Sequence, residues 1–253
     1  MAMLQKLIGG LASKAARYSC SKPFTLRNPQ PMVSVTFDDV PDSACHNGAA
    51  ILEEFGWRGT FYIASGTCGT RDEFWDVISR EDVGALHRRG HEIGCHTFSH
   101  VPVAALDADA LGVEIKRNRE TLRALCGDLA LTSFCFPYGK VSLPRKLQLQ
   151  PLFDTCRSIY EGVNAGRTDL AMLRVIELYD RTLTPEKLQA VLLETRERNG
   201  WLIFYTHDVA DAPSWIGCSP QRMRETLAAV RDAGLDVLTI RDAVDAAGYR
   251  RAA

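Results

Sequence analysis

The chain has 253 residues, of which 46% are hydrophobic and 24% are charged, and its formal net charge is -1. That length fits one α/β barrel domain or two small domains, and the apolar content excludes an intrinsically disordered chain. The near-neutral charge and the lack of a basic run argue against a nucleic-acid-binding protein.

Residues 1–28 are predicted to form an amphipathic helix and a lead-in, followed by one barrel domain over residues 29–253. Leu4, Leu7 and Leu11 recur at helical spacing, with basic residues between and after them. Their apolar run is too short for a secretory signal or a membrane span. A helix that packs on the domain is the main interpretation, and a helix on a membrane surface is the alternative.

Short apolar runs alternate with longer helical patterns along the rest of the chain. The expected strands are residues 33–37, 60–64, 92–96, 131–136, 153–159, 173–178, 201–206 and 237–240. The expected helices are residues 44–55, 80–89, 107–126, 185–197 and 220–233. Repeated strand-then-helix order predicts a parallel sheet. We expect an α/β fold, a distorted (β/α) barrel of seven or eight units, with an open doubly wound sheet as the alternative.

The eight cysteines form no C-x-x-C pair, which argues against a structural zinc ribbon. Cys95, Cys135 and Cys156 lie in apolar strand-like runs, where a free thiol packs as a small hydrophobic group. With no secretion signal recognised, we expect reduced thiols and a cytoplasmic protein.

Polar side chains follow three of the expected strands at the point where each strand ends. These side chains are Asp38 and Asp39, then His96 and His100, and finally His207. In a parallel barrel the carboxyl ends of all strands open on one face, where active sites lie. We therefore expect these residues to share one pocket.

The spacing of His96 and His100 suggests a metal site. Residues four apart lie on one side of a helical turn, so both imidazoles can face one ion. One carboxylate from Asp38 or Asp39 would complete a two-histidine, one-carboxylate set that leaves positions open for water and substrate. An ordinary turn is the alternative for the aspartates, but it explains neither histidine.

His207 ends another expected strand, and an imidazole is suited to proton transfer near neutral pH. It is therefore a candidate general acid. His46, His87 and His91 lack this placement and are expected to be surface or packing residues.

Four motifs together resemble the polysaccharide deacetylase family, also called the NodB homology domain or carbohydrate esterase family four. They are T-F-D-D at 36–39, H-T-F-S-H at 96–100, C-F-P-Y-G at 135–139 and Y-T-H at 205–207. The first two match the family patterns, whereas the family usually has R-x-P-Y-G and L-x-H at the last two. The resemblance spans about residues 31 to 245, with the motifs in the family order.

The resemblance implies a distorted barrel in which Asp39, His96 and His100 bind one divalent metal ion. Zinc is the expected metal, and cobalt, nickel, manganese or iron are alternatives. The family acts on chitin oligomers, peptidoglycan, xylan and other glycans, and one branch acts on small non-sugar amides.

The resemblance also assigns roles in the reaction. Asp38 would be the catalytic base, His207 the catalytic acid, and the backbone N–H of Tyr138 would help to hold the oxyanion. We also expect Pro137, Tyr138 and Trp215 to contact the substrate, because an aromatic ring at a barrel mouth can stack on a sugar face.

Three departures from the family pattern affect these assignments. Cys135 stands where the family has an arginine that orients the base, and the tryptophan of the usual fourth motif has no clear match. Arg157, on the next expected strand, is our candidate for the missing positive charge; an arginine on a helix-facing or solvent-facing surface is the alternative. Tyr205 replaces the leucine of the last motif.

The leading functional prediction is an N-deacetylase that acts on an N-acetylated sugar, glycan or glycan precursor during synthesis of a surface polysaccharide, such as lipopolysaccharide, O-antigen or exopolysaccharide. One alternative is a hydrolase of a small linear or cyclic amide on the same scaffold. The other is a non-catalytic sugar-binding protein. The sequence does not indicate the oligomeric state.

Overall fold

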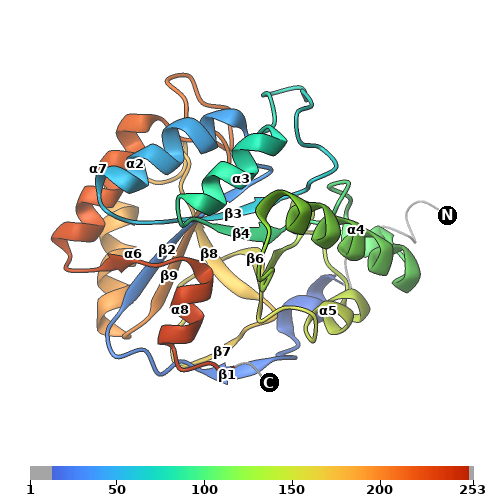
Figure 1. Cartoon of the computed structure of the whole chain (residues 1–253). Coiled ribbons are helices and arrows are strands. Elements are labelled where there is room, and N and C mark those ends of the chain that lie inside the picture. The colour runs from blue at the N-terminus through green and yellow to red at the C-terminus, as the bar shows by residue number, and fades with distance from the viewer. Residues whose placement is uncertain (1–12, 251–253) are drawn as a thin grey trace.

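Seven parallel strands close into a barrel in the computed structural model of this chain, which describes residues 13–250 (Figure 1). In ring order they are β2 (Met32–Asp38), β3 (Thr60–Ile63), β4 (Glu92–Cys95), β5 (Ser133–Cys135), β6 (Thr155–Glu161), β8 (Leu173–Glu177) and β9 (Trp201–Thr206). Pairing of β9 with β2 along residues 32–37 closes the ring. The predicted parallel barrel is confirmed, and the open sheet is wrong.

The ring is uneven, which makes the barrel distorted. A short strand, β10 (Asp236–Val237), pairs with the start of β2, and β3 pairs with β2 only from Thr36 onward. Between β4 and β5 the register holds a single pair, Cys95 with Phe134. The sheet is therefore weakly joined at this seam.

Alternate residues of each strand face two apolar layers, which explains the nearly continuous apolar runs in the sequence. In β2, Val33, Val35 and Phe37 belong to the large core cluster that also contains helix residues such as Leu227. Met32 belongs to the second cluster, with barrel-lining side chains of β9. Both faces of the strand are buried, as expected for a parallel sheet covered by helices.

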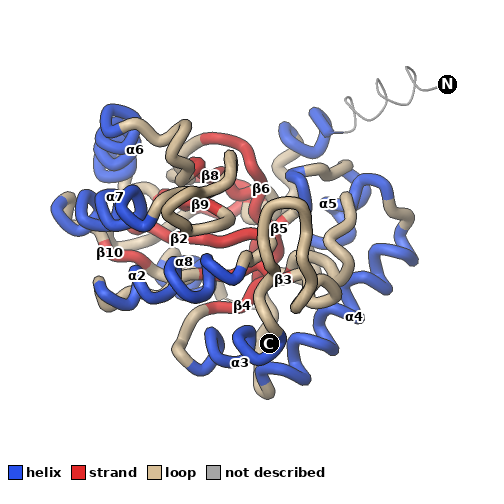
Figure 2. The backbone as a smooth tube through the Cα atoms, turned by 90° about the horizontal axis from the view of Figure 1, so that it is seen from above, coloured by secondary structure: helices blue, strands red, loops and turns tan. Residues whose placement is uncertain are grey.

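Five of the predicted helices surround the strands (Figure 2). They are α2 (Ala49–Glu54), α3 (Arg80–Arg88), α4 (Ala108–Cys126), α6 (Pro185–Glu197) and α7 (Pro220–Asp232), and a short π-helical turn over Ala44–Gly48 precedes α2. Ser79, Asp107, Thr184 and Ser219 each accept a hydrogen bond from the backbone N–H three residues ahead. These side-chain caps fix where four of the helices begin.

Within residues 13–250, two α-helices and two β-strands were not expected. Two are the seven-residue helices α5 (Leu143–Leu149) and α8 (Ile240–Ala246), which are too short to show a clear helical period. The others are β1 (Pro23–Thr25) and β7 (Arg167–Asp169), which pair antiparallel with each other although they are far apart in sequence. The strand expected at 237–240 is wrong in its second half, because Thr239 caps α8.

Glu92 fixes helix α8 to the floor of the barrel, at the amino ends of the strands. Its carboxyl group accepts hydrogen bonds from Ser133 Oγ (2.6 Å), Thr60 Oγ1 (2.9 Å) and the backbone N–H of Arg241 (2.8 Å). The side chain is buried, and burial raises its pKa above the ordinary value. This end of the barrel is closed by hydrogen bonds among buried side chains.

The N-terminal segment is only partly described. The predicted apolar residues Leu4, Leu7, Ile8 and Leu11 lie outside residues 13–250, whereas residues 13–18 are helical and Ala16 is buried. The division of the chain at residue 28 therefore remains a prediction. Among the helices of residues 13–250, none combines the length and the apolar character that a bilayer span requires.

Candidate active site

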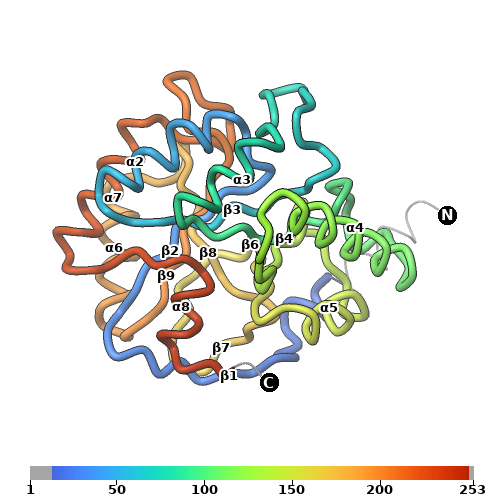
Figure 3. Tube along the Cα trace, viewed as in Figure 1, coloured from blue at the N-terminus to red at the C-terminus, as the bar shows by residue number. Residues whose placement is uncertain are grey.

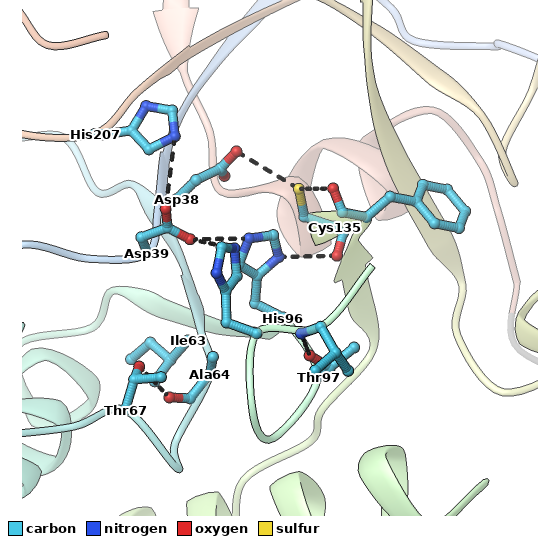
Figure 4. A network of polar contacts seen from close by, with 12 residues as sticks. Asp38, Asp39, Ile63, Ala64, Thr67, His96, Thr97, Cys135 and His207 are labelled. Atoms are coloured by element: carbon cyan, nitrogen blue, oxygen red, sulfur yellow. Dashed lines mark hydrogen bonds and ion pairs between the residues drawn. The ribbon is translucent and has the colours of Figure 1, made fainter. Parts of the chain in front are cut away.

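Two aspartates and three histidines meet at the carboxyl ends of β2, β4 and β9 (Figure 4). Asp39 Oδ1 lies 2.8 Å from His100 Nε2 and 3.2 Å from His96 Nε2. Asp39 Oδ2 lies 3.9 Å from His207 Nε2. Asp38, the last residue of β2, lines the same cavity as these four residues. The structure therefore brings together all five polar residues that were predicted to share a pocket.

Asp39, His96 and His100 are arranged as ligands of one cation. Their candidate ligand atoms all lie within 4.8 Å of one another. Asp39 Oδ1 is buried and accepts no hydrogen bond of acceptable geometry, although two imidazole nitrogens are close to it. His96 Nδ1 donates to the backbone carbonyl of Cys135 (2.9 Å), which leaves Nε2 free to face Asp39. Two nitrogens and one carboxylate oxygen suit zinc or a similar divalent ion.

A second set of possible ligands consists of Asp38, His96 and Cys135. The guanidinium of Arg157 already contacts both Asp38 and the Cys135 thiol, so a positive charge occupies that position. Of the two aspartates, Asp39 is therefore the one whose carboxylate is open to a cation.

Arg157 lies inside the barrel and not on a surface. Its side chain is fully buried, and Nη2 donates to Asp38 Oδ1. Burial alone would raise the pKa of Asp38, but Arg157, with His96 and His207, lowers that pKa below its usual value. The alternative of a helix-facing or solvent-facing arginine is wrong, and Asp38 is held as a carboxylate.

His207 is oriented by the loop that follows β9. Its Nδ1 donates to the backbone carbonyl of Ile216 (3.1 Å), so Nε2 faces the cavity. Asp208 organises this loop by accepting hydrogen bonds from the N–H and the hydroxyl of Ser214. Trp75 stacks on the imidazole at 5.9 Å and is only 8% exposed, so its ring serves mainly as a wall for His207.

The backbone around these side chains is conformationally strained. Asp39, Thr97, His100 and Tyr138 all have φ between 52° and 63°, which non-glycine residues rarely adopt. Each such residue costs roughly 1–3 kcal/mol and persists only where surrounding structure enforces it. Strain of this kind is concentrated at functional sites, and here it coincides with the ligand cluster.

The five polar residues lie in a cavity of about 750 Å³. The loops after β3 and β9, cyan and orange in Figure 3, form part of its walls. Four large apolar side chains on the cavity wall are exposed: Phe74, Tyr138, Ile159 and Trp215. The cavity is thus a polar centre with an apolar rim, as in many ligand sites.

The predicted substrate contacts fall into two groups. Tyr138 and Trp215 line the cavity, and the Tyr138 ring lies 4.4 Å from that of His100. Pro137 is buried and is not among the lining residues. Phe74, Ile159 and Arg181 line the cavity but were missed, because no motif or strand-end position marked them in the sequence.

Comparison with known proteins agrees with this geometry. A family model described as polysaccharide deacetylase matches residues 25–149, which include the first three motifs. Residues 25–149 belong to the polysaccharide deacetylase family. The match runs from the last residue of β1 to the end of α5, so Arg157 and His207 lie outside it.

Two curated deacetylases are similar to this chain over part of their length. A chitin deacetylase of Arthroderma benhamiae is 27% identical over 106 residues, covering 42% of this chain and 27% of that protein. A chitooligosaccharide deacetylase of Rhizobium leguminosarum bv. trifolii is 26% identical over 100 residues, covering 39% of this chain and 43% of that protein. The chain thus aligns with less than half the length of either relative.

Solved structures of the family share the fold. A family 4 carbohydrate esterase from Bacillus anthracis superimposes with a TM-score of 0.60 at 14% identity, covering 95% of this chain and 93% of that one. At this identity the likeness concerns the barrel and not the substrate.

Proposed function

We propose that this chain is a metal-dependent hydrolase that removes N-acetyl groups from a carbohydrate. The observation that carries the proposal is the convergence of Asp39, His96 and His100 beside a second, charged carboxylate, Asp38, with His207 in the same cavity. Metal-assisted hydrolysis of an amide uses an electrophilic cation, a base and an acid, and this cavity offers candidate residues for all three tasks.

Asp39, His96 and His100 would hold the cation. A bound divalent ion supplies a Lewis acid that polarises a carbonyl and lowers the pKa of water. Asp38 then removes the proton of the attacking water, because Arg157 keeps its carboxyl group ionised. The new C–O bond forms as negative charge develops on the carbonyl oxygen, and the backbone N–H of Tyr138 is our candidate donor to it.

His207 would complete the reaction as the imidazolium, with a proton on each ring nitrogen, by donating the Nε2 proton to the departing nitrogen as the C–N bond breaks. Its Nδ1 is occupied by the Ile216 carbonyl, so Nε2 is the only ring nitrogen directed at the cavity. An unprotonated amine anion is a poor leaving group, which is why an acid is required here. The products are acetate and a free amino sugar.

The cavity wall supports a saccharide as the substrate. Exposed aromatic rings at Phe74, Tyr138 and Trp215 offer apolar faces of the kind that stack on sugar rings. We propose an N-acetylated sugar, glycan or glycan precursor of a surface polysaccharide, processed in the cytoplasm. A small amide would leave most of the 750 Å³ cavity unfilled, so this alternative gains no support.

A release assay tests the proposal. Purified protein is incubated with N-acetyl sugars, nucleotide-linked N-acetyl sugars and chitooligosaccharides, and acetate is measured with and without a chelator and after addition of Zn²⁺. We expect acetate release that the chelator abolishes and zinc restores. Turnover of ureides or formamides with no acetate from any saccharide would overturn the assignment in favour of small amides, and chelator-resistant turnover would overturn the metal site.

A further inference from the structure

Arg157 reaches Asp38 from an unusual direction. It extends from β6, and its direct neighbour in the sheet register is Cys135 of β5. Nη2 donates to Asp38 Oδ1 and to Cys135 Sγ (2.7 Å), and Nη1 donates to the backbone carbonyl of Ser158 (2.9 Å). Nε has no hydrogen-bond partner within the described residues. These contacts define one edge of the guanidinium plane but do not hold its two faces.

Two aromatic rings lie close to the guanidinium. Its central carbon is 4.9 Å from the ring centroid of Tyr205 and 5.2 Å from that of Tyr62. Cation–π attraction is strongest where water is excluded, and Arg157 is fully buried. A planar guanidinium is well suited to this environment, whereas a lysine ammonium is not.

The surrounding residues make room for this arrangement. A Cβ atom added at Gly94 would lie 2.5 Å from the Tyr62 ring, so a larger residue there would displace Tyr62. Cys135 is short enough for Arg157 to pass its thiol on the way to Asp38. Tyr62 Oη has no hydrogen-bond partner within the described part of the chain, so the ring and not the hydroxyl explains its burial.

We propose that Tyr62 and Tyr205 form an aromatic clamp that positions Arg157 against Asp38. The inference rests on the proposed function in one respect, the role of Asp38 as the base. Cys135, Arg157 and Tyr205 then belong to one arrangement. Arg157 extends from β6, the short side chain of Cys135 lets it reach Asp38, and Tyr205 provides one of the two rings. Tyr62 and Tyr205 are positioning residues that act through Arg157.

The clamp makes an unexpected prediction for Tyr205. Tyr205→Leu restores the residue usual in the family, yet we expect it to lower kcat by about tenfold, the size of a desolvated cation–π contact, with the bound metal retained. Tyr205→Phe keeps the ring and should stay within about threefold of the wild type. Tyr62→Leu and Tyr62→Phe should show the same contrast.

Tyr205 also lines the cavity, so a second background separates positioning from substrate contact. When Tyr205→Leu is introduced into the Arg157→Met variant, it should change kcat by less than about threefold, because no cation remains to be positioned. An equal tenfold loss in both backgrounds would contradict the clamp. If Arg157→Met does not fold, Arg157→Gln, which also removes the cation, serves as the background.

Equilibrium unfolding tests the clamp independently of activity. Tyr62→Leu, Arg157→Met and the double variant are compared by their unfolding equilibrium constants. The effect of the double variant should differ by about fivefold or more from the product of the two single effects. Tyr249→Leu is the matched control, because its ring lies 5.2 Å from a different cation, Lys22 Nζ, and it should be additive with Arg157→Met. Additivity for Tyr62 as well would overturn the clamp. Absence of deacetylation by the wild type would overturn the proposed function alone, since the unfolding cycle needs no substrate.

Discussion

The two ends of the barrel treat a buried carboxyl group in opposite ways. At the mouth, Asp38 faces the guanidinium of Arg157, and its pKa is lowered despite burial. At the floor, Glu92 receives hydrogen bonds from two hydroxyls and a backbone N–H, and burial raises its pKa. A charged carboxylate is thus maintained only at the end where a counter-charge is buried beside it.

The backbone differs between the two ends in the same sense. The mouth contains Asp39, His100 and Tyr138 at positive φ, which costs stability. At the floor, Asn199, just before β9, also has a positive φ of 45°, a conformation that asparagine tolerates better than most residues, and the short helix α8 is capped by Thr239. The comparison suggests that the floor stabilises the fold and the mouth holds a reactive arrangement at the expense of stability.

Asp38→Asn should have the largest effect at the mouth. The amide cannot accept a proton, so we expect kcat to fall on the order of 10³-fold while zinc stays bound. Acetate release and metal analysis of the same sample measure both quantities. Near-normal turnover would show that Asp38 is not the base. The charged carboxylate at the mouth would then have no more part in the reaction than Glu92 at the floor.

Arg157→Met tests whether the mouth depends on its counter-charge. Removing one partner of a buried ion pair leaves an uncompensated charge, so we expect a loss of roughly 3 kcal/mol or more in unfolding free energy near pH 7. Denaturant unfolding measures it. The double variant Asp38→Asn/Arg157→Met should recover part of this loss. Failure to recover would mean that Arg157 stabilises the barrel by packing alone.

His91, at the floor, gives a pH-dependent test. Burial lowers its pKa to about 4 in the folded protein. Because the folded value lies below the unfolded value of 6.5, its contribution to stability is complete above pH 6.5 and is lost as the pH falls toward 4. Over that range we expect the wild type to lose up to about 3 kcal/mol relative to His91→Gln. Parallel stability curves for the two proteins would contradict the assignment.

Glu92→Gln should have the smallest effect and the opposite pH trend. The amide group cannot accept all three hydrogen bonds, so we expect a loss of about 1–2 kcal/mol at pH 5. The pKa of Glu92 is higher in the folded than in the unfolded protein. The extra stability that Glu92 gives the wild type is therefore complete below the unfolded pKa and decreases as the pH rises through the folded pKa. Unfolding at pH 5 and 8 measures the difference. Turnover should change little, and a large loss of turnover would show that the two ends are not independent.

The sequence predicted the barrel and the polar cluster because both depend on local signals. Runs such as residues 201–205 are apolar, and Asp38 and His96 each stand directly after a largely apolar run. The contact of Arg157 with Asp38 depends on the register of β5 and β6, so the sequence offered it only as one of two alternatives.

Other features were beyond sequence reasoning for physical reasons. The cavity rim at Phe74 and Ile159 depends on how loops fold over the barrel, which no periodic pattern records. The pairing of β1 with β7 joins segments from distant parts of the chain, and three residues on each side give too little alternation to detect.

The loop after β9 links two tasks through neighbouring peptide groups. The carbonyl of Trp215 accepts a hydrogen bond from Arg181 Nε, and the next carbonyl, that of Ile216, accepts one from His207 Nδ1. The residue that carries the exposed indole is therefore joined directly to the residue whose carbonyl orients the imidazole. We therefore expect that a substitution in this loop that changes the affinity for the proposed substrate will also change turnover.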